Sequence, residues 1–390
     1  PLPTLDEIKA KLDKMISQNN QIDTSELDEE GKEKLCKAAL GLTLQEAENA
    51  FALAMVNDGR IDGKDLVVIL SEKMQVIKKT GILEFINTDI KVSDVGGLEN
   101  LKSWLNKRNN SWSEAAKKYC LPAPKGVLIT GVPGCGKSLT AKAMSAAWQL
   151  PLLKLDFGKI FSGIVGSSEE NMRKAIKTAE AVAPSILWVD EIEKSLSGIN
   201  SNGDSGTSSR IFGTFLTWMQ EKTAPVFVIA TANNISGLPA ELLRKGRFDE
   251  IFFVDLPTHR ERKEIFKLHL AKRLKDKDVA SKLIVNDDLY EKLADLTEGF
   301  VGAEIEQVVI TALYEAFFNK RPLEFSDLEN TIKNVVPLSV TQKEQILSLR
   351  QWANIRAVAA TKKDDMAEYS SDTDENSDIN NSRGGRALDV

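Results

Sequence analysis

Hydrophobic positions recur at helical spacing over the first part of the chain. Within residues 4–86 the apolar side chains repeat every three or four positions, beginning with Leu5, Ile8, Leu12, Met15 and Ile16. This period predicts amphipathic helices. Turn signals at Asp58-Gly59-Arg60 and Asp62-Gly63 interrupt them, and a last helix is expected from Lys64 to about Phe85. We therefore predict a helical N-terminal region over residues 1–90.

The pattern changes after about Lys125, where short β-rich apolar runs alternate with helical stretches. The runs that predict strands are Gly126–Thr130, Leu152–Leu155, Ile186–Val189, Val226–Ala230 and Ile251–Val254. Strands that alternate with helices predict a parallel sheet with helices on both faces, so the expected fold class is α/β. We assign this domain to residues 91–257.

Helical periodicity returns after Pro257 and predicts a small all-α domain over residues 258–360. The expected helices are Arg260–Leu274, Asp287–Leu296, Ala303–Asn319, Phe325–Val335 and Thr341 to about Ala359. From Thr361 the chain is poor in apolar residues, with seven acidic and no basic residues between Asp364 and Asp378. This composition predicts an acidic disordered tail over residues 361–390.

Charge is unevenly distributed over the 390 residues, whose formal net charge is -6. Residues 1–90 hold 11 Lys+Arg against 17 Asp+Glu, residues 91–360 hold 36 against 32, and residues 361–390 hold 4 against 8. Two acidic flanks thus surround a slightly basic centre, which lacks the strong positive charge of a dedicated nucleic-acid module. No nucleic-acid partner is expected, and the absence of any run of about 18 apolar residues predicts no membrane span.

Cys36, Cys120 and Cys135 lie far apart, without a Cys-x-x-Cys spacing, in a chain with only two histidines. Neither a disulfide framework nor a zinc site is expected, which favours a reducing compartment such as a cytosol or a plastid stroma. The first residues contain neither the basic nor the apolar region of an export signal. The chain begins with Pro1 rather than Met, which is compatible with a fragment or a processed product.

The strongest motif is Gly131-Val132-Pro133-Gly134-Cys135-Gly136-Lys137-Ser138, between a predicted strand and the helical run Leu139–Trp148. It matches the P-loop pattern, in which glycines let backbone N–H groups face phosphate oxygens at a helix N-terminus. We expect residues Gly131 to Leu139 to bind ATP, with Lys137 at the β- and γ-phosphates and Ser138 on Mg²⁺. The alternative is an ordinary glycine-rich turn.

Two later strands end in polar residues, at the sheet edge where ligands of parallel sheets bind. Asp190 and Glu191 follow the apolar run that ends at Val189. We expect Asp190 to hold the Mg²⁺ shell and Glu191 to polarise the attacking water, the alternative being a charged turn. Asn233 follows the next strand and would bind the γ-phosphate or the lytic water, although Asn is also a common turn residue.

The order of these motifs, completed by Leu242-Leu243-Arg244-Lys245-Gly246-Arg247-Phe248-Asp249, resembles the AAA family of ring-forming ATPases. The match covers about residues 90–320 and includes Val92–Leu98 and Gly299–Ile305. The resemblance implies a P-loop NTPase fold of the AAA type with a helical lid, and a homo-hexameric ring.

The resemblance also implies roles for single residues. Asn233 would be the sensor, and the backbone near Val95 and Gly96 would border the adenine. Arg244, with Arg247, would act as an arginine finger on the ATP of the neighbouring subunit. Because a finger supplied in trans can be worth ~10³–10⁵ in rate, a monomer is expected to be nearly inactive.

One position departs from the family pattern. Ring translocases of this family grip polypeptide with an aromatic residue after the second strand, where this chain has Ile164. An aliphatic side chain offers less contact area and no π-face. The expected function, ATP-driven remodelling of an unknown partner protein, therefore keeps an alternative, a nucleotide-dependent regulatory or assembly module with little translocation. The run Gly198–Ser209 is expected to form a mobile loop that faces the pore, or a plain surface loop.

The flanking regions carry weaker resemblances. Leu40–Phe51 resembles the closing helices of an AAA lid, which indicates either the remnant of a preceding module or ordinary helical packing. The whole layout, including Pro337–Thr341 and Trp352-Ala353, resembles the family of AAA proteins of cyanobacteria and algal plastids called hypothetical chloroplast open reading frame forty-six. That resemblance implies an ATPase of photosynthetic organisms, in a chloroplast stroma or a cyanobacterial cytoplasm.

Overall fold

The computed structural model describes residues 3–19, 22–40, 42–88, 90–109, 111, 112, 116, 118–161, 167–194, 205–235, 237–244 and 246–362. Several features expected from the sequence lie outside these residues. They are Ile164, residues 198–204 of the expected Gly/Ser-rich loop, Lys245, and residues 363–390 of the expected acidic tail.

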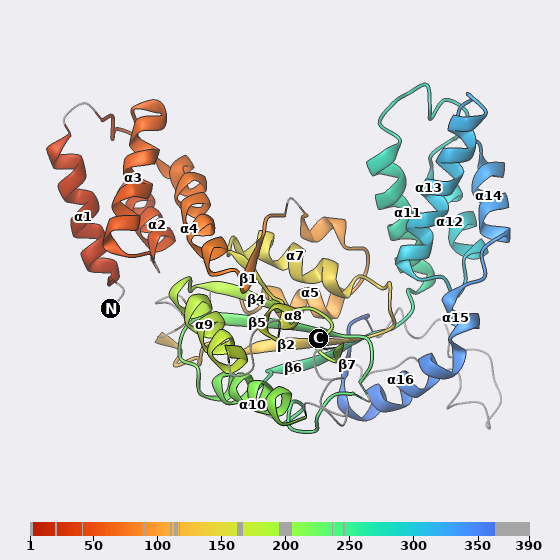
Figure 1. Cartoon of the computed structure of the whole chain (residues 1–390). Coiled ribbons are helices and arrows are strands. Elements are labelled where there is room, and N and C mark those ends of the chain that lie inside the picture. The colour runs from red at the N-terminus through yellow and green to blue at the C-terminus, as the bar shows by residue number, and fades with distance from the viewer. Residues whose placement is uncertain are drawn as a thin grey trace.

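A seven-stranded sheet in the order β1-β3-β4-β5-β2-β6-β7 forms the centre of the molecule (Figure 1). Neighbouring strands are parallel except for the edge pair of β1 and β3, which is antiparallel. The strands are β1 (Leu83–Ile86), β2 (Gly126–Gly131), β3 (Leu152–Leu155), β4 (Ser185–Val189), β5 (Val226–Ala232), β6 (Glu250–Val254) and β7 (Val358–Ala359). The five runs predicted from the sequence are strands β2 to β6, which confirms the α/β fold class.

Helices cover both faces of the sheet, because strand residues alternate between two buried cores. On one face α5 (Glu99–Asn106) and α7 (Lys137–Trp148) pack with Val127 and Ile129. On the other face Leu128 packs with α9 (Ser167–Ala181), α10 (Ser205–Glu221) and α16 (Lys343–Arg356). The short α8 (Phe157–Phe161) joins this second core. Both faces are therefore apolar, and polar chemistry is left to the strand ends.

Three expected boundaries were wrong. The helix predicted to reach Phe85 is α4 (Leu66–Thr80), because Gly81 takes a left-handed φ of 70° and the next residues join the sheet as β1. The helix predicted to reach Ala359 ends at Arg356, where Ala357 is extended and leads into β7. Residues 205–209, expected in a loop, are the first five residues of α10. The two edge strands were missed because their residues had been assigned to the ends of these two predicted helices.

The described residues of the N-terminal region form the helices α1 (Leu5–Gln18), α2 (Glu29–Ala39), α3 (Leu44–Asp58) and α4, with the 3₁₀ turn η1 (Gly63–Asp65) before α4. They enclose a core of their own around Ile8, Leu12 and Phe51. Thr4 and Thr43 each form a capping box that begins a helix, and Gly59 ends α3 in a left-handed conformation. This is the local chemistry that the helical pattern predicts.

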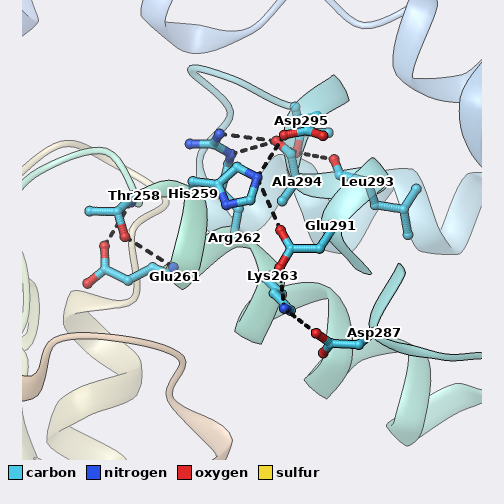
Figure 2. A network of polar contacts seen from close by, with 11 residues as sticks. Thr258, His259, Glu261, Arg262, Lys263, Asp287, Glu291, Leu293, Ala294 and Asp295 are labelled. Carbon is cyan, nitrogen blue, oxygen red and sulfur yellow. Dashed lines mark hydrogen bonds and ion pairs between the residues drawn. The ribbon is translucent and has the colours of Figure 1, made fainter. Parts of the chain in front are cut away.

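The segment after the sheet forms a second helical core from α11 (His259–Arg273), α12 (Asp287–Leu296), α13 (Gly302–Phe318) and α14 (Phe325–Lys333). Polar contacts join α11 to α12 (Figure 2). The buried Arg262 donates to the Ala294 carbonyl, and His259 Nε2 lies 2.8 Å from Asp295 Oδ1. The chain then returns through helices α15 (Leu338–Thr341) and α16 to the sheet. No helix among the described residues is both long and apolar enough to cross a membrane.

Candidate functional site

The glycine-rich motif forms the turn between β2 and α7, and its backbone requires glycine. Gly131 has φ 139°, and a Cβ there would lie 2.0 Å from the Val254 carbonyl oxygen on β6. Gly134 and Gly136 have φ values of 78° and 86°, and Gly136 caps α7. The Val132 N–H donates to Val254 O at 2.9 Å and so fixes the loop to β6. The loop therefore has the strand-turn-helix frame of a phosphate site.

Lys137 is only 6% exposed, and its ammonium group donates to the carbonyl oxygens of Gly131 and Val132 at 2.9 and 2.7 Å. Burial lowers the pKa of Lys137 to about 8, because a charged amine loses its hydration inside the loop. An anionic ligand would compensate that loss and favour the charged form. The position thus favours phosphate binding.

Cys135 is partly buried against a small cluster formed by Val132, Leu256 and Val301. Burial raises the pKa of its thiol to about 12, which disfavours the thiolate that a nucleophile or metal ligand needs. We interpret Cys135 as a packing residue of the loop.

The acids at the end of β4 meet the loop. Asp190 Oδ1 accepts from the hydroxyls of Ser138 at 2.8 Å and Thr231 at 2.6 Å. Glu191 has a left-handed φ of 49°, and its N–H donates to Thr231 Oγ1 at 3.0 Å. Asn233 Nδ2 donates to Glu191 Oε1 at 2.8 Å. The structure therefore brings together four of the residues selected from the sequence, Ser138, Asp190, Glu191 and Asn233.

Two residues of this network were missed from the sequence. Thr231 links the acids of β4 to each other through its single hydroxyl, which donates to Asp190 and accepts from Glu191. Glu193 is buried, accepts from the Asn233 N–H at 2.9 Å through Oε1, and has an Oε2 without a hydrogen-bond partner in the described part of the chain. A threonine near the end of an apolar strand and an acid three residues after Asp190 are the only sequence signals for them.

The donor set at Ser138 and Asp190 suits magnesium rather than a softer metal. It consists of one hydroxyl and one carboxylate, both hard oxygen ligands. Within the described residues no cluster of three or more His, Cys, Asp or Glu side chains is arranged to hold a metal ion. Magnesium that is bound through one or two protein oxygens and the phosphates of a nucleotide needs no such cage.

A pocket of about 250 Å³ adjoins the loop, between the sheet and the second helical core. Val95 and Gly96 line it from one side, and Gly134, Gly136 and Leu139 from another. Residues of α11 and α13 complete the wall: Glu261, Ile265, Leu268, His269, Gly302, Ala303 and Glu306. The pocket therefore joins the residues that the family resemblance assigns to the adenine to those of the loop predicted to bind the phosphates.

The helical core after the sheet touches the loop directly. The Ala303 N–H at the start of α13 donates to the Gly134 carbonyl at 3.0 Å. Glu261 on α11, which is buried, accepts from the Leu98 N–H at 3.2 Å and the Thr361 hydroxyl at 3.0 Å. A movement of this helical core would therefore change contacts on both sides of the pocket.

The two arginines expected to act together are not part of this cluster. Arg244 is exposed, and its side chain forms no hydrogen bond or ion pair within the described residues. Arg247 donates to the Glu241 carbonyl in the same turn. Neither side chain contacts the glycine-rich loop within the described part of its own chain, which leaves both guanidinium groups outside the local site.

Comparison with known proteins gives matches along most of the chain. Residues 127–256 match the model of the ATPase family associated with various cellular activities (AAA), and residues 287–330 match the AAA+ lid domain. Residues 6–80 match the second domain of SpoVK-like AAA ATPases.

Several relatives are similar over nearly the whole chain. AAA domain-containing proteins named ycf46 from Pyropia yezoensis and Trieres chinensis are each 46% identical over 90% of this chain. The matched regions span 70% and 69% of the lengths of these two relatives. A cell division cycle protein 48 homolog from Archaeoglobus fulgidus is 32% identical over 56% of this chain and 30% of its own length. Among solved structures, the FIGL-1 AAA domain in complex with ADP aligns with a TM-score of 0.58 and 21% identity, over 73% of this chain and 97% of that one, a likeness of fold.

Proposed function

Because this chain belongs to the ycf46 family of AAA domain-containing proteins, we propose that it is an ATPase that couples Mg-ATP hydrolysis to the remodelling of a partner protein or complex. One contact carries the proposal: Ser138 Oγ lies 2.8 Å from Asp190 Oδ1, at the mouth of the glycine-rich loop. In P-loop NTPases a hydroxyl and a carboxylate of this kind hold the Mg²⁺ of the bound nucleotide, and this supports the proposal.

Each polar residue of the site has a role in this proposal. Lys137 would bind the β- and γ-phosphates, with Gly131 to Leu139 around them, while Val95 and Gly96 border the base. Ser138 and Asp190 would hold magnesium, which supplies charge neutralisation at the phosphates. Asn233 holds the Glu191 carboxylate at 2.8 Å, so that Glu191 can orient a water molecule and accept its proton.

The exposed Arg244 supports an assembled ATPase. A guanidinium group that is exposed on its own chain is available to the nucleotide of a neighbour, with Arg247 beside it. We propose a homo-hexameric ring, with the chain divided as predicted into residues 1–90, 91–257, 258–360 and 361–390. From the algal sources of the relatives we place the protein in a plastid stroma or a cyanobacterial cytoplasm, with a role in photosynthetic regulation.

ATP binding and phosphate release by the purified full chain test the proposal. Wild type should bind ATP and release phosphate in the presence of Mg²⁺, whereas Lys137→Ala should lose at least about 100-fold of the turnover. Lys142→Ala, on the same helix but outside the loop, is the matched control and should keep both. A wild-type protein that neither binds nor hydrolyses ATP would overturn the proposal.

The alternative function, a regulatory or assembly module whose nucleotide state matters more than its turnover, is favoured by Ile164. Proteins retained by an ATP-loaded Glu191→Gln variant, compared with those retained by Lys137→Ala, identify the partner. Release of that partner upon hydrolysis by wild type supports remodelling. If ATP-bound wild type, which hydrolyses ATP, and ATP-bound Glu191→Gln, which does not, both retain the partner stably, the result supports the regulatory module.

A further inference from the structure

One lysine interrupts an otherwise apolar strand next to the site. β3 reads Leu152-Leu153-Lys154-Leu155, and the three leucines are buried. Leu152 and Lys154 lie on the same face of the sheet, opposite Ile186 and Trp188 in the parallel register with β4. A charge at this position costs apolar packing, and Lys154 takes no part in the proposed ATPase reaction.

The side chain of Lys154 is directed to the acid that would hold magnesium. Its ammonium group lies 4.8 Å from the centre of the Trp188 ring and 3.8 Å from Asp190 Oδ2. Because Asp190 Oδ1 already accepts from two hydroxyls, Lys154 faces the other carboxylate oxygen. The lysine side chain is only 32% exposed and the aspartate side chain 21%, so the pair is partly shielded from water.

We propose that Lys154 is a positioning residue that acts through Asp190: it provides a fixed positive charge that opposes divalent metal binding and so sets the magnesium concentration at which the nucleotide site loads. The inference rests on the proposed function, because it concerns magnesium at the same site. A positive charge within about one Debye length of a divalent cation repels it, and partial burial reduces screening of that repulsion. The Trp188 ring stabilises the ammonium group in this place, since a cation over an aromatic face is attracted to it.

The inference distinguishes Lys154 from a second lysine beside the same ring. Lys142 Nζ lies 5.6 Å from the centre of Trp188, but no ion pair between Lys142 and Asp190 is present in the described structure. If the effect comes from charge at the carboxylate, only Lys154 should alter magnesium binding. If it comes from packing on Trp188, both lysines should matter.

Magnesium titrations of binding of a fluorescent ADP analogue, N-methylanthraniloyl-ADP, test the inference. Lys154→Met, which keeps a long stem on Trp188, should lower the half-saturating Mg²⁺ concentration by about 5- to 10-fold, with unchanged ADP affinity in EDTA. Lys154→Arg should remain within about twofold of wild type because it keeps the charge, and Lys142→Met should not differ from wild type.

The outcomes separate the inference from the proposed function. An unchanged half-saturating concentration in Lys154→Met, or the same decrease in Lys154→Arg, overturns the role of the charge while nucleotide binding stands. The same decrease in Lys142→Met assigns the effect to Trp188 packing and also overturns it. Absence of nucleotide binding by every variant, with and without Mg²⁺, overturns the proposed function and the inference with it.

Discussion

The side-chain amide of Asn233 donates a hydrogen bond to Glu191 Oε1 over 2.8 Å, across 42 residues of sequence. The other Glu191 oxygen lies 2.6 Å from Lys194 Nζ, three residues away on the same segment. One carboxylate is therefore held from two sides at the end of β4. This arrangement orients an acid that can serve as a general base, with a neutral amide on one oxygen and an ammonium group on the other.

Replacement of Glu191 by Gln should separate binding from turnover. Gln keeps the size of the side chain and an oxygen that can accept from Asn233, but it cannot take a proton from water. We expect ATP affinity within about threefold of wild type and phosphate release lowered by about 10²- to 10⁴-fold. Calorimetry and a phosphate-release assay check the two parts. Glu298→Gln, at an exposed position, is the control, and undiminished turnover in Glu191→Gln would remove Glu191 from the reaction.

Thr231 should matter through its hydroxyl alone. Thr231→Val keeps the branched shape in a buried strand but leaves Asp190 Oδ1 and the Glu191 N–H without their shared partner. We expect turnover lowered by about 10- to 100-fold, because both acids lose a positioning hydrogen bond. Thr231→Ser keeps the hydroxyl and should retain most of the activity. Equal losses in both variants would show that strand packing, not the hydroxyl, is what the site needs.

The sequence predicts those parts of the site that depend on local chemistry. The glycine-rich loop and the acids after β4 are readable because a fixed spacing of Gly, Lys and Ser has one known structural use. Thr231 and Glu193 could not be selected, because their partners are about 40 residues away and become neighbours only when β4 and β5 pair. The edge strands β1, of four residues, and β7, of two residues, were not predicted for the same reason. These residues form strands only because each pairs with an edge of the sheet that is distant in the sequence.

Arg244 should act on the site of a neighbouring subunit. Arg244→Ala and Lys137→Ala should each be nearly inactive alone, since one would lack the proposed finger and the other the proposed phosphate-binding lysine. Mixed in equal amounts, they should recover part of the turnover wherever an intact loop meets an intact Arg244. Phosphate release is measured against the summed rates of the separate variants. A mixture that never exceeds that sum contradicts a finger supplied in trans.

The pair of Arg350 and Asp255 should contribute strongly to stability. Arg350 on α16 makes three contacts of 2.9 to 3.1 Å with the Asp255 carboxylate after β6, and the Asp255 side chain is only 5% exposed. Arg350→Ala removes the guanidinium group from a buried carboxylate that keeps the Leu256 N–H at 2.7 Å, so we expect the free energy of unfolding to fall by about 3 kcal/mol.

Chemical unfolding followed by circular dichroism measures this loss. Arg173→Ala serves as the matched control, because the pair of Arg173 and Glu169 is a solvent-exposed one at 4.0 Å, with side chains 67% and 36% exposed. It should cost less than about 0.5 kcal/mol. A loss in Arg350→Ala no larger than that of the control would mean that Asp255 finds other partners when Arg350 is removed.

Lys73 on α4 joins the N-terminal helices to the sheet domain. It is 3% exposed, and its amine donates to the carbonyls of Ala38, near the end of α2, at 3.1 Å and Val182, just after α9, at 3.2 Å. Burial lowers the pKa of Lys73 to about 7. A neutral amine has two N–H donors, which these two carbonyls satisfy.

This contact predicts a pH dependence of stability. The unfolded chain keeps Lys73 protonated up to a pKa of about 10.4, whereas the folded chain releases the proton above about 7. Between these values the unfolded state binds more protons, so stability rises with pH by up to about 1.4 kcal/mol per unit and falls as pH is lowered toward 7. Below pH 7 both states are protonated, and Lys73 adds no further pH dependence.

Lys73→Met should remove this contribution while it keeps a long apolar stem at the interface. Between pH 7.0 and 8.5 the free energy of unfolding of the variant should therefore rise less steeply with pH than that of wild type. The difference between the two slopes corresponds to the uptake of about one proton on unfolding. Lys137 and Lys222, whose pKa values are lowered to about 8, remain in both proteins and cancel in the difference. Urea unfolding at several pH values gives the two slopes, and identical slopes would show that Lys73 is charged in the folded protein and is held by the two carbonyls as an ammonium ion.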